Sequence, residues 1–216
     1  DPSHPLARIA PHLVKTVGGF RIGLIGLTTP GLPYWLRPEL LRGYEVTDPV
    51  KALRTSLRYL REEAKVDAVV VCGHMGIKES DDFANRVLAL LEEEEGPDVY
   101  LAGHTHRDQP STFVNGTLYT QSDYFGIHCG RVDLSFDVES RRIVEKRAYT
   151  VLMDERIKED PLVLEIAGND LEDAKGYLAG EMGELAIELS SRQPGPGMSS
   201  PLQTLIASSA LHVASK

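Results

Sequence analysis

The sequence predicts an α/β fold in which strands and helices alternate through the first half of the chain and strands dominate after it. Apolar runs of strand length stand at residues 20–27, 67–72 and 98–102, and leucines between them recur at helical spacing. Hydrophobic residues make up 42% of the chain and charged residues 25%, which is ordinary for a globular protein. The 216 residues exceed an average domain but fit one large α/β domain.

The first elements follow from local signals. Residues 1–18 contain several prolines and histidines and are expected to be irregular, and residues 20–27 form the first strand. Asp48 and Pro49 then begin a helix that runs to about residue 64, because aspartate caps free backbone amides and proline suits the first helical turn. The leucines at helical spacing along it are Leu53, Leu57 and Leu60.

A strand–helix–strand unit is predicted next. Residues 67–72 are rich in valine, which is typical of a strand covered on both faces. Residues 78–95 are predicted to form a helix whose acidic end, residues 92–95, is a solvated surface turn. Gly96-Pro97 ends this helix, and residues 98–102 form the next strand. Such a unit of roughly 30 residues makes its two strands parallel.

The second half of the chain has a different pattern. Three β-rich stretches are predicted to form an antiparallel meander, and Asn115-Gly116 is a strong hairpin signal within it. An amphipathic helix, a strand and a final helix are predicted further on. The meander stretches are residues 112–121, 130–137 and 142–153, and the later elements are residues 160–178, 180–189 and 200–214.

Histidines stand at the ends of the two predicted parallel strands. His74 follows the first strand within Gly-His-Met-Gly, and His104 and His106 follow the second within Gly-His-Thr-His. Ligands of open α/β sheets bind at the carboxyl ends of the strands, and imidazole is a common ligand of zinc and iron. If residues 104–106 are extended, the two imidazoles point the same way; if the chain curls at Gly103, they diverge toward two ions. The sequence predicts a metal site shared by these three histidines.

Other reactive and aromatic side chains have weaker signals. His128 is either a strand-edge histidine or a residue that orients a metal ligand. Cys72 and Cys129 are predicted to be small buried residues and not a disulfide or a metal-binding pair. The aromatic pairs Tyr34-Trp35 and Tyr124-Phe125 are predicted to pack in the core or in loops in preference to stacking on a nucleotide.

Taken in order, these motifs resemble the calcineurin-like metallophosphoesterases, in the branch that contains 5′-nucleotidases and 2′,3′-cyclic nucleotide 2′-phosphodiesterases. The GHTH motif at residues 103–106 and the preceding strand that ends at His74 are similar to the second half of that catalytic domain. Three further stretches carry the resemblance. The first is RIGLIGLTTP at residues 21–30, followed by Trp35. The second is residues 115–121 with GIHCGRVDL at residues 126–134, and the third is EMGE at residues 181–184 with PLQTLIA at residues 201–207.

The resemblance implies a fold and a domain plan. The fold would be part of a four-layer α/β/β/α sandwich that lacks its N-terminal strands. Residues 1–155 would be the C-terminal half of the catalytic domain, and residues 156–198 would hold a helix, a strand and a linker. Residues 199–216 would begin a truncated C-terminal nucleotide-binding domain.

The resemblance also implies an activity, which is metal-dependent hydrolysis of phosphate esters, above all nucleotides. Two divalent ions, of zinc, manganese or iron, would carry the reaction. His74 and His104 would bind one ion and His106 the other. The family's Asp-x-His, Gly-Asp and Asn-His motifs do not occur in the chain. We therefore expect part of a longer protein, with partial metal occupancy and no catalytic residue assigned within the 216 residues.

Two rival interpretations remain open from the residues. The chain could be a non-catalytic half-domain that needs a partner chain carrying the missing half, or a protein that binds a single metal ion through three histidines. A substrate-binding residue is not predicted in any of the three cases.

Charge and hydropathy restrict the partners. The net charge of −9 disfavours a nucleic-acid polymer, whose binding depends on basic patches, but it is compatible with a small phosphate ester held by metal cations. An apolar run of 18 residues does not occur, so a membrane span is not expected. The family resemblance implies a periplasmic or secreted protein, while a cytoplasmic location stays open.

Overall fold

The structure is a computed structural model that describes residues 9–93, 95–181, 183–186 and 188–215. It divides into two compact units, residues 1–157 and 158–216, and each unit is described by itself. The division falls close to residue 155, where the sequence places the end of the catalytic segment. The assignment of the predicted segments to particular domains of the family stays a prediction.

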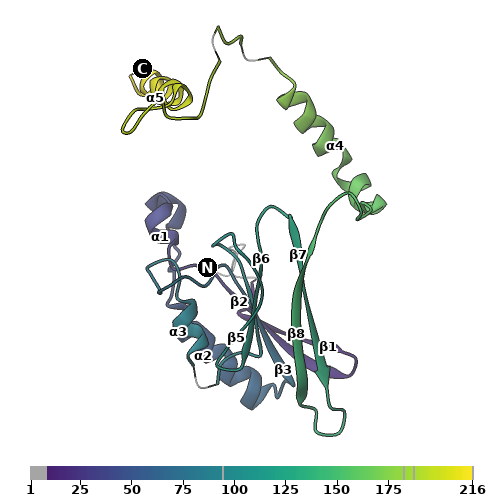
Figure 1. Ribbon diagram of the computed structural model, residues 1–216. Coiled ribbons are helices and arrows are strands. Elements are labelled where there is room, and N and C mark those ends of the chain that lie inside the picture. The colour runs from purple at the N-terminus through teal and green to yellow at the C-terminus, as the bar shows by residue number, and fades with distance from the viewer. Residues whose placement is uncertain (1–8, 94, 182, 187, 216) are drawn as a thin grey trace. The chain divides into compact units, whose positions relative to one another are not determined.

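The first unit is built on a six-stranded mixed sheet (Figure 1). Its strand order is β1-β2-β3-β4-β6-β5, in which the four inner strands are parallel and the two edge strands are antiparallel to their neighbours. The predicted α/β class is therefore confirmed. The inner strands are β2 (Phe20–Leu27), β3 (Ala68–Gly73), β4 (Val99–Ala102) and β6 (Thr117–Ser122), and the edge strands are β1 (His12–Val17) and β5 (Asp108–Val114).

Strand β1 corrects the prediction that residues 1–18 are irregular, as far as residues 9–18 are described. It pairs along its whole length with β2. Gly18 and Gly19 make the return possible, because both have positive φ, at 57° and 85°, which glycine adopts without a steric penalty. The prolines and histidines near the start of the chain hid this strand, whereas the double glycine was the available hairpin signal.

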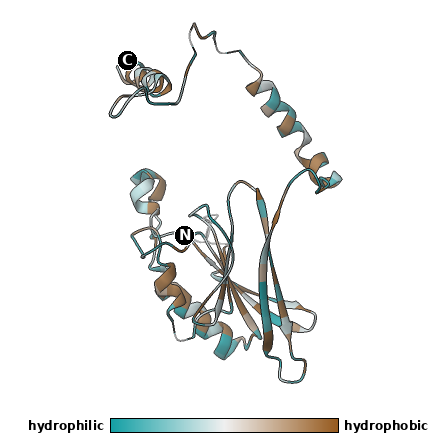
Figure 2. Ribbon diagram, viewed as in Figure 1, coloured by the Kyte–Doolittle hydropathy of each residue, from teal (hydrophilic) through white to brown (hydrophobic). Residues whose placement is uncertain are grey.

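Helices cover one face of the sheet. Helix α2 (Pro49–Arg58) begins where the sequence predicts, since Asp48 accepts hydrogen bonds from the backbone N–H groups of Val50 and Lys51. It continues as a π-helical segment, η3 (Tyr59–Glu63). The predicted leucine stripe is buried against the sheet, and Figure 2 shows the apolar colour along the strands and on α3 (Val87–Leu91). The core includes Leu53, Leu57 and Leu60 with Ile25, Val69, Val71, Tyr100 and Tyr119.

The helix predicted over residues 78–95 is wrong for most of its length, because only α3 is helical there. Carboxylates take the backbone N–H groups that a longer helix would use. Asp81 accepts from Leu88 and Ala89, and Asp82 accepts from Ala84 and Asn85. Aspartate side chains often compete with helical hydrogen bonds in this way.

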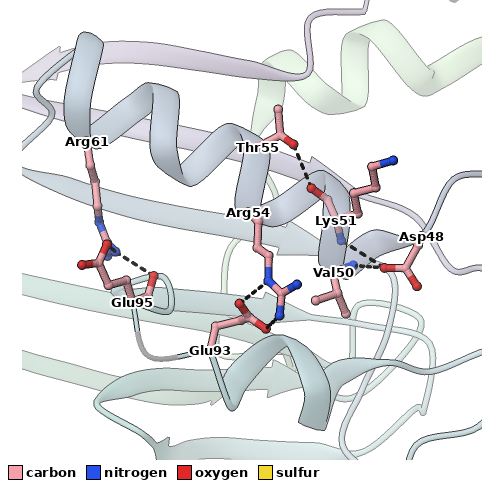
Figure 3. A network of polar contacts seen from close by, with 8 residues as sticks. All are labelled: Asp48, Val50, Lys51, Arg54, Thr55, Arg61, Glu93 and Glu95. Atoms are coloured by element: carbon pink, nitrogen blue, oxygen red, sulfur yellow. Dashed lines mark hydrogen bonds and ion pairs between the residues drawn. The ribbon is translucent and has the colours of Figure 1, made fainter.

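The acidic end of this segment is more than a solvated turn. Glu93 forms a two-point ion pair with Arg54 of α2, at 2.5 and 2.7 Å, and its side chain is only 19% exposed. Arg61 donates to the backbone oxygens of Glu95 and Gly96. Figure 3 shows these contacts tying α2 and η3 to the segment after α3. Residue 94 lies outside the described residues.

The predicted meander is partly wrong. Asn115 and Gly116 do form the hairpin turn between β5 and β6, both with positive φ. However, β6 pairs in parallel with β4, and β7 (His128–Phe136) and β8 (Ile143–Leu152) form a separate two-stranded sheet. Three residues with positive φ separate β6 from β7 and turn the chain out of the larger sheet, and they are Asp123, Phe125 and Gly126.

The sheet face opposite the helices is covered only in part. Near β8, which packs against β5 and β6, Leu118 and Thr120 are buried. Over β2 and β3 the same face is more open, because Leu24 and Val70 are half-buried and Cys72 is exposed. Parallel sheets are usually covered on both faces. The region over β2 and β3 therefore has room for further chain.

Both cysteines are free and exposed, which corrects the prediction that they are buried. Cys72 lies on the open sheet face and Cys129 on the β7–β8 ribbon. The valine-rich context of Cys72 predicted burial because it assumed that both faces of β3 are covered.

Asp67 joins the start of β3 to the β7–β8 turn. Its carboxylate accepts from Arg141 at 2.5 and 2.8 Å and from the backbone N–H of Arg21 at 2.7 Å, and its side chain is 9% exposed. The Arg141 hydrogen bonds, despite the opposing effect of burial, hold the pKa of Asp67 below its ordinary value of 3.8.

We expect Asp67→Asn to lower the free energy of unfolding by about 1–2 kcal/mol at pH 7, because charge-assisted hydrogen bonds are lost. Since the folded pKa is depressed, the contribution is present above about pH 4 and fades as the pH falls through the folded value. Urea unfolding at pH 7 and pH 3 measures this. The control is Asp133→Asn, which removes an exposed ion pair with Arg131. If Asp67→Asn lowers the free energy of unfolding by the same amount at pH 7 and at pH 3, the ionised Asp67 carboxylate does not stabilise the fold.

The second unit contains two helices in the predicted places, α4 (Pro161–Leu178) and α5 (Pro201–Ala214). Asp160 caps the first, and Ser200 forms a capping box with Gln203 at the second. The strand predicted at residues 180–189 does not form in the part of this range that the structure describes. Among the described helices, none is long and apolar enough to cross a bilayer.

Candidate functional site

The candidate site lies in two loops at the carboxyl ends of β3 and β4. Gly73 of β3 is the register partner of Ala102 of β4, so the loops that follow both strands leave the same edge of the sheet. His74 begins the first loop, where its backbone N–H donates to Leu27. The rings of His74 and His104 meet edge-on, with centroids 5.1 Å apart and planes at 60°. The structure thus brings these two predicted residues together.

The GHTH segment is curled and not extended. The backbone N–H of Thr105 donates to the oxygen of Gly103 at 2.9 Å, which closes a three-residue turn around His104 with φ at 74°. His106 also has positive φ, at 51°. Such backbone conformations are rare outside glycine and are concentrated at functional sites. Of the two conformations considered from the sequence, the structure has the one in which the imidazoles diverge.

His106 does not join the other two histidines in a common cluster. Its ring stacks on Tyr124 at 5.3 Å. Across the described residues, no group of three or more His, Cys, Asp or Glu side chains is arranged to hold a metal ion. The structure therefore provides a pair of neighbouring imidazoles and a separate third one.

Gly76 allows the two loops to approach each other. A Cβ atom at this position would lie 2.1 Å from Thr105 Oγ1 and 2.8 Å from the backbone oxygen of Gly103. A glycine permits this close contact between the two loops because it has no side chain.

Gln121 of β6 holds the GHTH loop through hydrogen bonds of its side-chain amide. This role was not predicted from the sequence. Its amide is satisfied at both ends when the nitrogen faces Tyr119 Oη and Thr105 Oγ1, each at 2.8 Å. The oxygen then accepts from the backbone N–H groups of Arg107 at 2.9 Å and His106 at 3.1 Å. Tyr119 Oη also accepts from the backbone N–H of Ile77 in the His74 loop.

This network is buried, since Gln121 is 1% exposed and Tyr119 is fully buried. A buried and satisfied polar network fixes the groups that it joins. The only signal in the sequence was a glutamine near the carboxyl end of a strand. Alternation along a strand does not show which polar residue points inward.

The electrostatic environment keeps His104 neutral. Burial lowers its pKa below the ordinary 6.5, and the neighbouring His74 and Lys78 lower it further. A neutral imidazole is the form that binds metal ions. Lys78 is itself paired with Asp82 at 2.8 Å, and this hydrogen bond lowers the pKa of Asp82 to about 2.

The pair of imidazoles fits a divalent ion as part of a ligand set. Imidazole suits the metals implied by the resemblance. Two imidazoles fill only half of a tetrahedral shell, so the described residues around His74 and His104 account for one part of such a site.

His128, the weaker candidate, lies near two carboxylates. Its Nδ1 is 3.4 Å from Asp123 Oδ2, and its Nε2 is 4.0 Å from Asp108 Oδ2. Within the described chain, the His128 ring makes no contact with the rings of His74, His104 and His106. A role in orienting a metal ligand stays a prediction.

The aromatic pairs are not in the core. Tyr34 is 72%, Trp35 48% and Phe125 90% exposed. Trp35 and Tyr124 contact the histidines of the GHTH loop. Of the predicted packing in the core or in loops, the structure excludes the core and has these residues in contact with other rings in loops. Whether they stack on a nucleotide is untested.

Residues 12–108 match the family model of calcineurin-like phosphoesterases. The trifunctional nucleotide phosphoesterase YfkN of Bacillus subtilis is 29% identical over 182 residues, which are 81% of this chain and 12% of that protein. The snake venom 5′-nucleotidase of Naja atra is 24% identical over 213 residues, which are 88% of this chain and 38% of that protein.

A solved structure supports the fold. The crystal structure of the calcineurin-like phosphoesterase YfkN from Bacillus subtilis has a TM-score of 0.69 at 18% identity, and the match covers 80% of this chain and 60% of that one. The chain therefore spans only a part of the relatives that it matches. On these findings, residues 12–108 are similar to a calcineurin-like phosphoesterase domain, and the fold is that of its solved relatives.

Proposed function

We propose that the protein takes part in metal-dependent hydrolysis of phosphate esters, with nucleotides as the substrate class, in the manner of a 5′-nucleotidase or a 2′,3′-cyclic nucleotide phosphodiesterase. The observation that carries the proposal is the contact between His74 and His104 at the carboxyl ends of two parallel strands. The names of the relatives, which are nucleotide phosphoesterases, support the substrate class.

In this proposal, His74 and His104 hold one ion and His106 holds a second. When bound, such ions would activate water and neutralise charge on the phosphoryl oxygens. The chain itself supplies imidazole nitrogens, directs them by the turn around His104, and fixes the turn through Gln121.

The site is proposed to be incomplete within the 216 residues. Within the described chain no carboxylate joins the histidines in a metal-binding group, and the sheet face over β2 and β3 is partly open. Both observations support completion by further residues of the same protein or of a separate chain. A site of three histidines around one ion has less support, because His106 stacks on Tyr124 and does not cluster with the pair.

The test compares the 216-residue chain alone with the same chain joined to a segment that carries the Asp-x-His, Gly-Asp and Asn-His motifs. Hydrolysis of bis(p-nitrophenyl) phosphate, AMP and 2′,3′-cyclic AMP is measured with Mn²⁺. We expect little or no turnover by the chain alone, and turnover by the joined protein that His104→Ala removes by at least about 100-fold, since ligand loss exceeds the effect of losing a supporting residue.

His212→Ala is the matched control, because His212 lies on the exposed surface of α5 in the other unit. Robust turnover by the chain alone, abolished by His104→Ala, would overturn the claim of an incomplete site. Turnover by the joined protein that survives His104→Ala would overturn the proposed function.

A further inference from the structure

We propose that Trp35 and Tyr124 are positioning residues, each of which holds one imidazole of the GHTH loop in a fixed orientation. Trp35 acts on His104 and Tyr124 acts on His106. The inference rests on the proposed function, since the orientation of an imidazole matters most when it binds a metal ion.

Metal-binding histidines are normally oriented by a hydrogen bond from the second ring nitrogen to a carboxylate or carbonyl oxygen. In the described part of the chain, neither His104 nor His106 makes a side-chain hydrogen bond. Each has an aromatic partner instead. The Trp35 and His104 rings are 5.2 Å apart with planes at 31°, and the Tyr124 and His106 rings are 5.3 Å apart with planes at 28°. The Trp35 contact is tilted and the Tyr124 contact is stacked, and both centroid distances are in the range of favourable ring contacts.

Trp35 is itself held in place by the turn that carries it. Its indole lies directly over Gly31, where a Cβ atom would be 2.6 Å from the ring. Gly31 donates its backbone N–H to Thr29 Oγ1, and Thr29, which is 1% exposed, donates to the backbone oxygen of Ala84. Phe83 contacts the indole from another side at 6.0 Å. A fixed indole can therefore fix the imidazole against it.

Tyr124 is held by a turn with an unusual backbone. Asp123 and Phe125, on either side of it, both have positive φ, and the backbone N–H of Ile127 donates to the oxygen of Tyr124. Phe125 packs edge-on against the Tyr124 ring at 5.0 Å and 83°, although it is 90% exposed. The turn keeps an exposed aromatic pair beside His106, an arrangement that core packing does not require.

The two aromatic residues serve as controls for each other. In the metal-free chain with ¹³C-labelled histidine, nuclear Overhauser effects (NOEs) between His104 and His74 and between His106 and Phe125 report the two ring orientations. We expect Trp35→Ala to remove the first contact and leave the second, and Tyr124→Ala to do the reverse. Trp35→Phe and Tyr124→Phe should restore the contacts in part, because a smaller or similar ring remains.

Gly31→Ala is a sharper variant, because it keeps the indole but displaces it. Gly31 has φ at −73°, so alanine fits the backbone and only the contact with Trp35 is strained. It should weaken the His104–His74 contact as Trp35→Ala does. If that contact persists at full intensity in Trp35→Ala, or if both variants disturb His104 and His106 equally, the inference is wrong.

A second measurement separates this inference from the proposed function. Co²⁺ binding is measured with the 216-residue chain joined to the segment that carries the missing motifs. The signal is quenching of the fluorescence of Trp35, the only tryptophan of the 216 residues. Variants without Trp35 are measured by dialysis. We expect Trp35→Ala to weaken binding about 10-fold. Failure of the wild-type protein to bind Co²⁺ would count against the proposed function alone, whereas unchanged NOEs in the metal-free variants count against the positioning role alone.

Discussion

Replacing Gly76 with alanine should both destabilise the protein and disorganise the candidate site. The new Cβ would lie 2.1 Å from Thr105 Oγ1, 2.5 Å from the side-chain amide of Gln121 and 2.8 Å from the oxygen of Gly103. Gly76 does not have positive φ, so the effect comes from the clash and not from the backbone. We expect the free energy of unfolding to fall by about 2–3 kcal/mol, the usual cost of overpacking a well-packed region, as measured by urea unfolding.

Two comparisons make this prediction specific. Gly26→Ala places a Cβ in open space and should change the unfolding free energy by less than about 0.5 kcal/mol. Thr105→Ala removes the nearest clashing atom, so the double variant should be more stable than the sum of the single changes predicts, with a coupling of about 1 kcal/mol. Additive effects would show that the two loops do not meet at this point.

Much of the fold could be predicted because it depends on local signals. The valine-rich run before His74, the cap at Asp48 and the Asn115-Gly116 turn each specify their own element. Their order predicts parallel strands, and parallel strands place His74 and His104 at one edge. The loop at residues 78–86 was not predicted, since helical spacing of apolar residues there does not reveal that Asp81 and Asp82 capture the backbone N–H groups.

The candidate site could be predicted as a set of ligands but not as a geometry. Histidine at a strand end is visible in the sequence, and so is the glycine that lets the chain approach. The turn around His104, the hydrogen bonds of Gln121 and the ring contacts of Trp35 depend on tertiary packing between segments far apart in the sequence. The exposure of Cys72 was also missed. A valine-rich strand is usually covered on both faces, and whether a segment covers the second face depends on tertiary packing.

The second large effect concerns metal binding by the two neighbouring imidazoles. His74 and His104 are 5.1 Å apart by ring centroids, and the lowered pKa of His104 favours the neutral form. Removing either one leaves a single nitrogen at that position, which cannot hold an ion by chelation. We therefore expect His74→Ala and His104→Ala each to weaken binding of a divalent ion by at least about 100-fold.

Equilibrium dialysis of the 216-residue chain against Zn²⁺ measures this binding. We expect the wild-type chain and His212→Ala to bind zinc alike, at a partial site, and His74→Ala and His104→Ala to lose that binding. Zinc binding that is the same in wild type and His104→Ala, or no zinc binding by the wild-type chain, would contradict this expectation.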